Sequence, residues 1–370
     1  MKMTMNPCAT AACAAVLLMS ASGVLQADET NEWEWVEARD FGVAGMPFKD
    51  AVTPYGRLPK GFAGASGWVR RLGRLSTGLS LRFAVDDNEV RLKCEIDPEC
   101  WKEATSGHYM TTFVNIGFDW YVWDGKRGEW VYENHLWPSK KDGSTDGVIR
   151  TRPGVPTLVN FPVRGEPLSV KIGVRRGHRL TRITSHKLAQ KPVVHYGTSI
   201  VQGGCVSRPG LLFTAAAARQ ADVEGVNLGF SGAARMEMDM CTGVVARVDA
   251  SLYILDCLWN MDGKMVSERC EPFVRELRRL RPDVPILLCE DVQTDRRETR
   301  MGLMVRKLHK KLVAEGWKWI YLLRTDEILP MDPDMTVDRC HPNDIGARIM
   351  AQVYADRVRK ILGVGCESGE

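Results

Sequence analysis

The hydrophobic pattern of this chain changes its period near Pro192. Up to about residue 185, apolar and polar residues alternate in short runs that glycine and proline interrupt, which is typical of antiparallel strands. From Pro192 onward, short apolar runs are separated by longer stretches of helical period. Alternation of strand and helix favours a parallel sheet with helices on both faces. We therefore predict an α/β fold class, with a three-layer α/β/α domain preceded by an antiparallel β-sandwich domain.

The β-sandwich domain is predicted to span residues 28–188. Its clearest runs, 79–85 and 90–96, flank the polar turn Asp86-Asp87-Asn88 and predict a β-hairpin; residues 158–163 and 168–174 are further strands. Aromatic faces suit sugar rings, so the tryptophans of this half have two interpretations: a sugar-stacking platform, or the sandwich core and the interface to the next domain. They include Trp120, Trp123, Trp130 and Trp137.

The second domain is predicted to span residues 189–370. We expect its strands at residues 193–196, 226–228, 252–255, 286–289 and 319–323, and helices at residues 211–221, 267–280 and 301–314. Asn343 is expected to cap a last helix. In such sheets, function gathers at the carboxyl ends of the strands. The residues just past predicted strand ends include Ser199, Gly229, Gly232 and Asn260.

The N-terminus has the pattern of a secretory signal peptide, residues 1–27. Lys2 precedes an apolar run from about Ala9 to Leu25, and acidic residues follow Ala27. Cleavage after Ala27 predicts a secreted or periplasmic protein; an uncleaved anchor is the alternative. No later stretch has the ~20 apolar residues that a membrane span needs, so we expect no stable membrane insertion after cleavage.

Charge and cysteine content give little sign of a nucleic acid partner or a metal. The net charge is +4. One basic cluster, within residues 175–187, lacks interleaved aromatics and is interpreted as a solvated connector, so no nucleic acid is expected. Cys94 and Cys100 are the best local disulfide pair, while Cys257 and Cys289 are expected to be buried thiols. The cysteine and histidine spacing predicts no metal site, and no cofactor is expected.

The apolar run Val193-Val194-His195-Tyr196 leads into Gly197-Thr198-Ser199 and indicates a strand that delivers a serine to a turn. A serine hydroxyl needs an imidazole to accept its proton and a carboxylate to orient that imidazole. Asp338 and His341 provide both on one loop, just before the last predicted helix. An oxyanion would need donors, which Gly232 offers through its backbone and Asn260 through its amide. Each residue could alternatively cap or support a turn.

These residues resemble the four sequence blocks of the SGNH hydrolases, also called GDSL-type esterases. The blocks are residues 197–200, 227–232, 256–260 and 338–342. The resemblance implies a triad of Ser199, His341 and Asp338, with an oxyanion hole formed by the N–H groups of Ser199 and Gly232 and the amide of Asn260. Gly117-Phe118-Asp119-Trp120-Tyr121 is also similar to the GxDLY motif of a β-domain that precedes one branch of this family.

The sequence departs from the family pattern at two blocks. Thr198 replaces the aspartate of the family name, which we interpret as a change in loop support. The third block has Leu258 and Met261 in place of its usual glycine and aspartate. Ser231 is a rival nucleophile, although its neighbour Gly232 fits the oxyanion role better. A GxSxG elbow of the other common hydrolase fold is absent from the sequence.

The resemblance implies an exported esterase, and the leading hypothesis is release of acetate from an acylated carbohydrate. Trp259 would limit the acyl pocket, and Arg208, Arg235 and Glu237 would contact sugar hydroxyls, although structural roles for these three residues remain open. The alternatives are a lipase or thioesterase of broad specificity, and a catalytically silent carbohydrate-binding protein.

Overall fold

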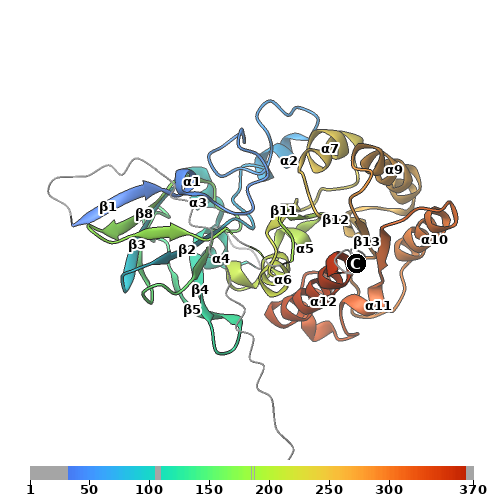
Figure 1. Cartoon of the computed structure of the whole chain (residues 1–370). Helices are drawn as coiled ribbons and strands as arrows, with labels where there is room; N and C mark the ends of the chain where they lie inside the picture. Colours follow the sequence, from blue (N-terminus) through green and yellow to red (C-terminus); the bar gives the residue numbers. More distant parts are fainter. Residues whose placement is uncertain (1–31, 105–109, 185, 187, 364–370) are drawn as a thin grey trace, which may run out of the picture.

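The computed structural model describes residues 32–104, 110–184, 186 and 188–363. The N-terminal half is built from antiparallel sheets, and the C-terminal half from a parallel sheet flanked by helices (Figure 1). The predicted fold class is therefore confirmed. The predicted signal peptide, residues 1–27, lies outside the described residues.

The N-terminal half contains two antiparallel sheets, with strand orders β1-β8-β3-β6 and β5-β4-β7-β2-β9. Apolar residues from both sheets pack into one buried cluster, as in a β-sandwich. The strands are β1 (Trp33–Glu37), β2 (Ser80–Val85), β3 (Glu89–Ile96), β4 (Phe118–Asp124), β5 (Glu129–Leu136), β6 (Thr145–Arg150), β7 (Thr157–Asn160), β8 (Pro167–Arg175) and β9 (Leu180–Arg182). The helices are α1 (Ala38–Phe41), α2 (Gly67–Leu72), α3 (Pro98–Ala104) and α4 (Thr112–Ile116).

The predicted hairpin between residues 79–85 and 90–96 is wrong. Both strands exist, but β2 pairs with β7 and β9, whereas β3 pairs with β6 and β8 in the other sheet. The connecting segment crosses from one sheet to the other, and its Asp87 is buried in an ion pair with Arg175. Alternating hydrophobicity identifies the face of a strand that enters the core, and both strands do face the same core. It does not identify the hydrogen-bonding neighbour.

The C-terminal half contains five parallel strands in the order β11-β10-β12-β13-β14. They are β10 (Val193–Gly197), β11 (Gly225–Gly229), β12 (Leu252–Asp256), β13 (Ile286–Cys289) and β14 (Ile320–Leu323), each within two residues of its predicted position. The helices are α5 (Ser199–Gln202), α6 (Phe213–Ala221), α7 (Met238–Gly243), α8 (Gly263–Met265), α9 (Glu271–Leu280), α10 (Arg300–Ala314), α11 (Thr325–Ile328) and α12 (Asp344–Gly363). The stretch predicted as one helix from residue 267 contains the π-helical turn Val266–Cys270 before α9.

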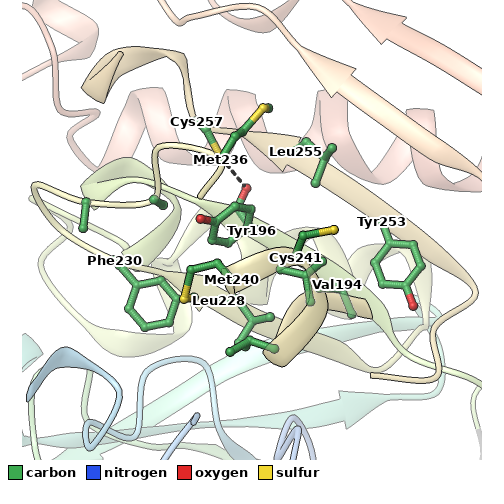
Figure 2. Packing of buried hydrophobic residues seen from close by; sticks show 14 of the residues in the cluster. Val194, Tyr196, Leu228, Phe230, Met236, Met240, Cys241, Tyr253, Leu255 and Cys257 are labelled. Atoms are coloured by element: carbon green, nitrogen blue, oxygen red, sulfur yellow. Dashed lines mark hydrogen bonds between the residues drawn. The ribbon is translucent and has the colours of Figure 1, made fainter. Parts of the chain in front are cut away.

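Alternate residues of the parallel strands enter two cores on opposite faces of the sheet. Val194 and Tyr196 of β10 pack with α7, α9 and α10, whereas Val193 packs with α6 and α12. Figure 2 shows the first of these cores, in which Tyr196 lies among side chains of neighbouring strands and of α7. Strands buried on both faces explain the nearly continuous apolar runs of the sequence.

The segment that resembles the GxDLY motif lies at the interface between the two halves. Asp119 of β4 accepts hydrogen bonds from the Gly210 N–H, at 3.0 Å, and from Arg208 Nη1, at 2.8 Å. A Cβ atom on Gly210 would lie 2.5 Å from Cε2 of Tyr121, so only glycine fits this approach. The motif therefore fastens the β-sandwich to the short 3₁₀ helix η1 (Pro209–Leu211).

The described cysteines are all free thiols, including the predicted pair Cys94 and Cys100. Cys257 and Cys289 are buried, as expected, and burial raises the pKa of both thiols. Within the described residues, no helix has the length and apolar character needed to cross a membrane.

Candidate active site

The carboxyl edge of the parallel sheet brings three of the predicted site residues onto neighbouring loops. Strands β11 and β12 flank β10, and Gly197 of β10 is in register with Gly229 and with Asp256. Ser199 follows β10, Gly232 follows β11 and Asn260 follows β12. The two outer loops therefore leave the sheet on either side of the serine.

Ser199, His341 and Asp338 form a continuous chain of hydrogen bonds. Ser199 Oγ lies 2.7 Å from His341 Nε2, and His341 Nδ1 lies 2.7 Å from Asp338 Oδ2. With the ring proton on Nδ1, the imidazole donates to the carboxylate and accepts from the hydroxyl, the arrangement in which it can take the serine proton. Both side chains of the loop are only about a quarter exposed. The geometry needed to activate a serine is thus present.

The Asp338 carboxylate is held in its ionised form. Partial burial pushes its pKa upward, but the backbone N–H and ring of His341 and the backbone N–H of Cys340 donate to it, and the net effect is a lowered pKa. The two backbone donors lie 2.7 and 3.0 Å from Oδ1. Because Oδ1 is occupied by the backbone, Oδ2 faces the imidazole and fixes the orientation of the ring.

Gly204 is a site residue that the sequence analysis missed. Its N–H donates to the Ser199 carbonyl at 2.8 Å, and a Cβ atom there would lie 3.0 Å from Cδ2 of His341. A larger residue at position 204 would therefore press on the imidazole. The doublet Gly203-Gly204, four and five residues after the serine, was the only signal in the sequence.

The loop after β11 holds Gly232 in a conformation that favours glycine, with φ of +67°. No acceptor for the Gly232 N–H lies among the described residues. The preceding Ser231 is anchored through its N–H and Oγ to Oε1 of Gln202, at 2.8 and 2.7 Å. Gln202 belongs to the helix that Ser199 begins, so this side chain ties the glycine loop to the serine.

Asn260 donates one amide hydrogen bond, from Nδ2 to the Ala233 carbonyl at 2.5 Å. A primary amide carries two N–H groups, so the second remains for another acceptor. Ala233 follows Gly232 directly, and the bond therefore joins the two loops that carry the predicted oxyanion donors.

Thr198 and Ser231 have local structural contacts. Thr198 is fully buried, caps the following helix by accepting from the Ile200 N–H, and donates its own N–H to the Asp256 carbonyl. The rival nucleophile Ser231 hydrogen-bonds to Gln202 and Arg164, neither of which is a general base. These contacts support the interpretation that Thr198 supports the loop, and they favour Ser199 over Ser231.

The four predicted substrate residues do not form one group in the structure, because each makes different contacts. Arg208 forms an ion pair with Asp119 at the interface described above. Arg235 Nη2 donates to the Gly232 carbonyl at 3.1 Å, and Glu237 accepts from the Tyr196 hydroxyl and the Arg235 N–H. Trp259 is half-buried against the core that contains α6 and α12. The contacts of the three charged residues favour the structural alternative left open by the sequence.

Two groups of side chains place potential metal ligands close together in the described part of the chain. One group is Asp338, Cys340 and His341, but both ring nitrogens of His341 already bond to Ser199 and Asp338. The other contains Glu166, whose carboxylate binds Arg74 in a bidentate ion pair. Neither group leaves a full set of ligands for a cation.

Comparisons with known proteins match both halves of the chain. Residues 190–361 match the model of the GDSL-like lipase/acylhydrolase family, and residues 33–180 match the GxDLY model, the N-terminus of an SGNH-hydrolase-type esterase. A search of curated proteins gave no match.

Solved structures share the complete two-domain architecture. A GDSL-like lipase from Bacteroides ovatus is 25% identical, with a TM-score of 0.78 over 90% of this chain and 98% of that chain. A salicylyl-acyltransferase from a tetracycline biosynthetic pathway is 17% identical, with a TM-score of 0.68 over 91% and 98%. A family two carbohydrate esterase from Cellvibrio japonicus is 11% identical, with a TM-score of 0.55 over 90% and 98%.

The last two structures share the fold alone, whereas the two family models together span nearly all of the described chain. The chain therefore belongs to the SGNH, or GDSL-type, family of ester hydrolases, in the branch in which a GxDLY β-domain precedes the hydrolase domain.

Proposed function

We propose that this protein is an exported serine esterase that removes short acyl groups, principally acetyl, from carbohydrates. The observation that carries the proposal is the hydrogen-bonded chain from Ser199 through His341 to Asp338, set beside the backbone of Gly232 and the amide of Asn260. The fold that it shares with a carbohydrate esterase supports the choice of substrate class.

In this mechanism, Ser199 Oγ attacks the ester carbonyl carbon while its proton passes to Nε2 of His341. The carbonyl oxygen becomes an oxyanion, which accepts from the N–H groups of Ser199 and Gly232 and from the free amide N–H of Asn260. Collapse of this intermediate breaks the bond to the sugar oxygen, and His341 returns the proton to that leaving oxygen. Water then attacks the acyl-serine, with His341 as the base, and releases the carboxylic acid.

The test is hydrolysis by the purified protein of acetylated xylan, acetylated glucomannan and simple alkyl esters of increasing acyl length. We expect acetate release from the polysaccharides and a decline in rate as the acyl chain lengthens. The Ser199→Ala variant should lose activity toward every ester. A preference for long acyl chains would instead favour the broad lipase or thioesterase.

The same experiment addresses the silent binding protein. If the wild-type protein hydrolysed no ester, and Ser199→Ala bound acetylated glycans as well as the wild type did, the catalytic proposal would be wrong.

Export is tested separately. Expression of the full chain in a bacterial host, followed by N-terminal sequencing of the secreted or periplasmic product, should show a chain that begins at Asp28. Recovery of the uncleaved chain in the membrane fraction would favour the anchor.

A further inference from the structure

We propose that Trp68, from the N-terminal domain, is the platform on which the sugar ring of the ester lies during hydrolysis. This inference rests on the proposed function and names the part of the molecule that recognises the carbohydrate. The sequence analysis did not single out this tryptophan.

Trp68 stands directly beside the predicted oxyanion loop. Its Nε1 donates to the Ser231 carbonyl at 2.7 Å, and this carbonyl belongs to the peptide bond that also contains the Gly232 N–H. Apart from atoms of Gly232 and its two neighbours in the chain, the only described atom within 4 Å of a Cβ on Gly232 would be Nε1 of Trp68, at 3.8 Å. The space next to Gly232 is therefore open and is bordered by the indole.

The indole combines exposure with a fixed position. Trp68 of α2 is 49% exposed. The only polar atom of its side chain, Nε1, already donates to the Ser231 carbonyl. The exposed remainder is the apolar ring. Single exposed hydrophobic residues are common on protein surfaces, so exposure alone would mean little. The distinguishing observation is the hydrogen bond to the loop that carries Gly232.

A buried arginine holds α2 against this loop. Arg57 has no exposed surface, and its guanidinium donates to carbonyls on both sides of the domain boundary. Nη2 donates to Leu72, the last residue of α2, at 2.7 Å, and Nη1 donates to Gly229, the last residue of β11, at 2.8 Å. Helix α2 cannot move away from the loop without breaking these bonds, so the indole is pre-positioned.

A second polar group on the same loop suits a hydroxyl-rich ligand. Arg164, also from the N-terminal domain, donates from Nη2 to Ser231 Oγ at 3.3 Å. Within the described residues it has no carboxylate partner in ion-pair range, and its Nε is buried without a hydrogen-bond partner. Trp68 and Arg164 thus bond to the same serine, and an apolar ring near a guanidinium matches the apolar face and the hydroxyl edge of a sugar.

The test compares two acetyl esters, an acetylated oligosaccharide and ethyl acetate, which has no ring to stack. Trp68→Ala removes both the ring and its hydrogen bond, while Trp68→Phe keeps an aromatic face without the N–H. We expect Trp68→Ala to lower kcat/KM for the oligosaccharide by roughly 10- to 100-fold, mainly through KM, and to change ethyl acetate hydrolysis by less than about threefold. Trp68→Phe should retain most of the oligosaccharide activity.

Trp319→Ala is the matched control, because this tryptophan is 48% exposed but precedes β14 at the opposite edge of the sheet. It should leave both activities unchanged. Equal losses on both esters in both Trp68 variants would show that Trp68 only anchors the loop, and no loss on either would place it outside the site. An inactive wild-type enzyme would overturn the proposed function, whereas an unchanged substrate ratio in active Trp68→Ala would overturn the sugar platform alone.

Discussion

Polar residues occupy two neighbouring regions, the carboxyl edge of the parallel sheet and a buried layer behind it that includes Arg57 of the N-terminal domain, and the regions differ in exposure. At the carboxyl edge of the sheet, Asp338 lies on a loop and Asn260 ends the short 3₁₀ helix after β12, and neither residue is buried. Behind that edge, Arg57 and Asp256 are buried and bond to backbone or to a single hydroxyl. Removing a polar side chain from water costs more free energy in the second region, which is buried, than in the first. We therefore expect substitutions at the edge to change turnover, and substitutions behind it to change stability.

Asp338→Asn should give the largest effect of the variants compared here. The amide cannot hold the proton of His341 on Nδ1 or stabilise the imidazolium, so kcat should fall by roughly 10⁴-fold at neutral pH. The melting temperature should stay close to that of the wild type, because the side chain lies near the surface. Steady-state kinetics on an acetyl ester and a thermal melt provide the two measurements.

Asp334→Asn is the matched control for Asp338→Asn, because this exposed aspartate lies four residues earlier on the same approach to α12. It should leave kcat unchanged. A large fall in melting temperature for Asp338→Asn would contradict the expectation that substitutions at the edge change turnover and not stability.

Asn260→Ala should have the next largest effect. Loss of one oxyanion donor should reduce kcat by roughly 100- to 1,000-fold while KM changes little. Asn260→Asp should be at least as damaging, because a carboxylate would face the developing oxyanion. Full activity in Asn260→Ala would exclude this residue from the oxyanion hole and leave its bond to Ala233 as its only role.

Sequence patterns predicted the fold class and the edge of the sheet well because both depend on local features. The apolar runs gave the strand positions, and the loops after β10, β11 and β12 contain the residues that the structure brings together. The hydrogen-bonding partner of each antiparallel strand could not be predicted from such local features. The failed hairpin shows that alternation defines a buried face without defining the neighbouring strand.

The buried layer could not be predicted, because its contacts join residues that are far apart in the chain. Arg57 and Asn227 are separated by 170 residues, and Asp256 and Tyr354 by 98. An arginine in a polar, glycine-rich segment usually lies at the surface. Its complete burial follows from docking of one domain on the other, which no local pattern encodes.

Arg57→Met tests the buried layer directly. Burial lowers the pKa of Arg57 to about 9, so the guanidinium stays charged at neutral pH, and its hydrogen bonds reach the carbonyls of Leu72, Leu75, Asn227 and Gly229. Methionine would remove the hydrogen bonds that the guanidinium donates to these carbonyls, and the free energy of unfolding should fall by about 3 kcal/mol. Chemical denaturation measures this change.

Arg348→Met is the control for Arg57→Met, since Arg348 is an exposed arginine of α12. It should leave the free energy of unfolding nearly unchanged. Arg57→Lys should fall between the wild type and Arg57→Met, because an ammonium can donate to some of the carbonyls. Wild-type stability in Arg57→Met would show that water replaces the guanidinium at the domain boundary.

Asp256→Asn should have the smallest effect, visible as a change in the pH dependence of stability. Burial raises the pKa of Asp256 to about 6, above its usual 3.8, although the Tyr354 hydroxyl donates to it at 2.8 Å. The folded protein therefore holds this proton more tightly than the unfolded chain. The contribution of Asp256 to stability is present below pH 4 and is lost as the pH rises from about 4 through 6.

An asparagine at position 256 does not ionise and can still accept from Tyr354, so the variant should gain stability over the wild type between pH 4 and 7, by roughly 2 to 3 kcal/mol. The variant must be compared with the wild type at each pH, because buried His195 acts in the opposite direction: burial lowers its pKa to about 3, so its contribution is lost as the pH falls below about 6.5. A difference between the two proteins that did not change with pH would mean that Asp256 ionises alike in the folded and unfolded states. The carboxylate would then be as well solvated as those at the catalytic edge, and the contrast between the two regions would not hold at this residue.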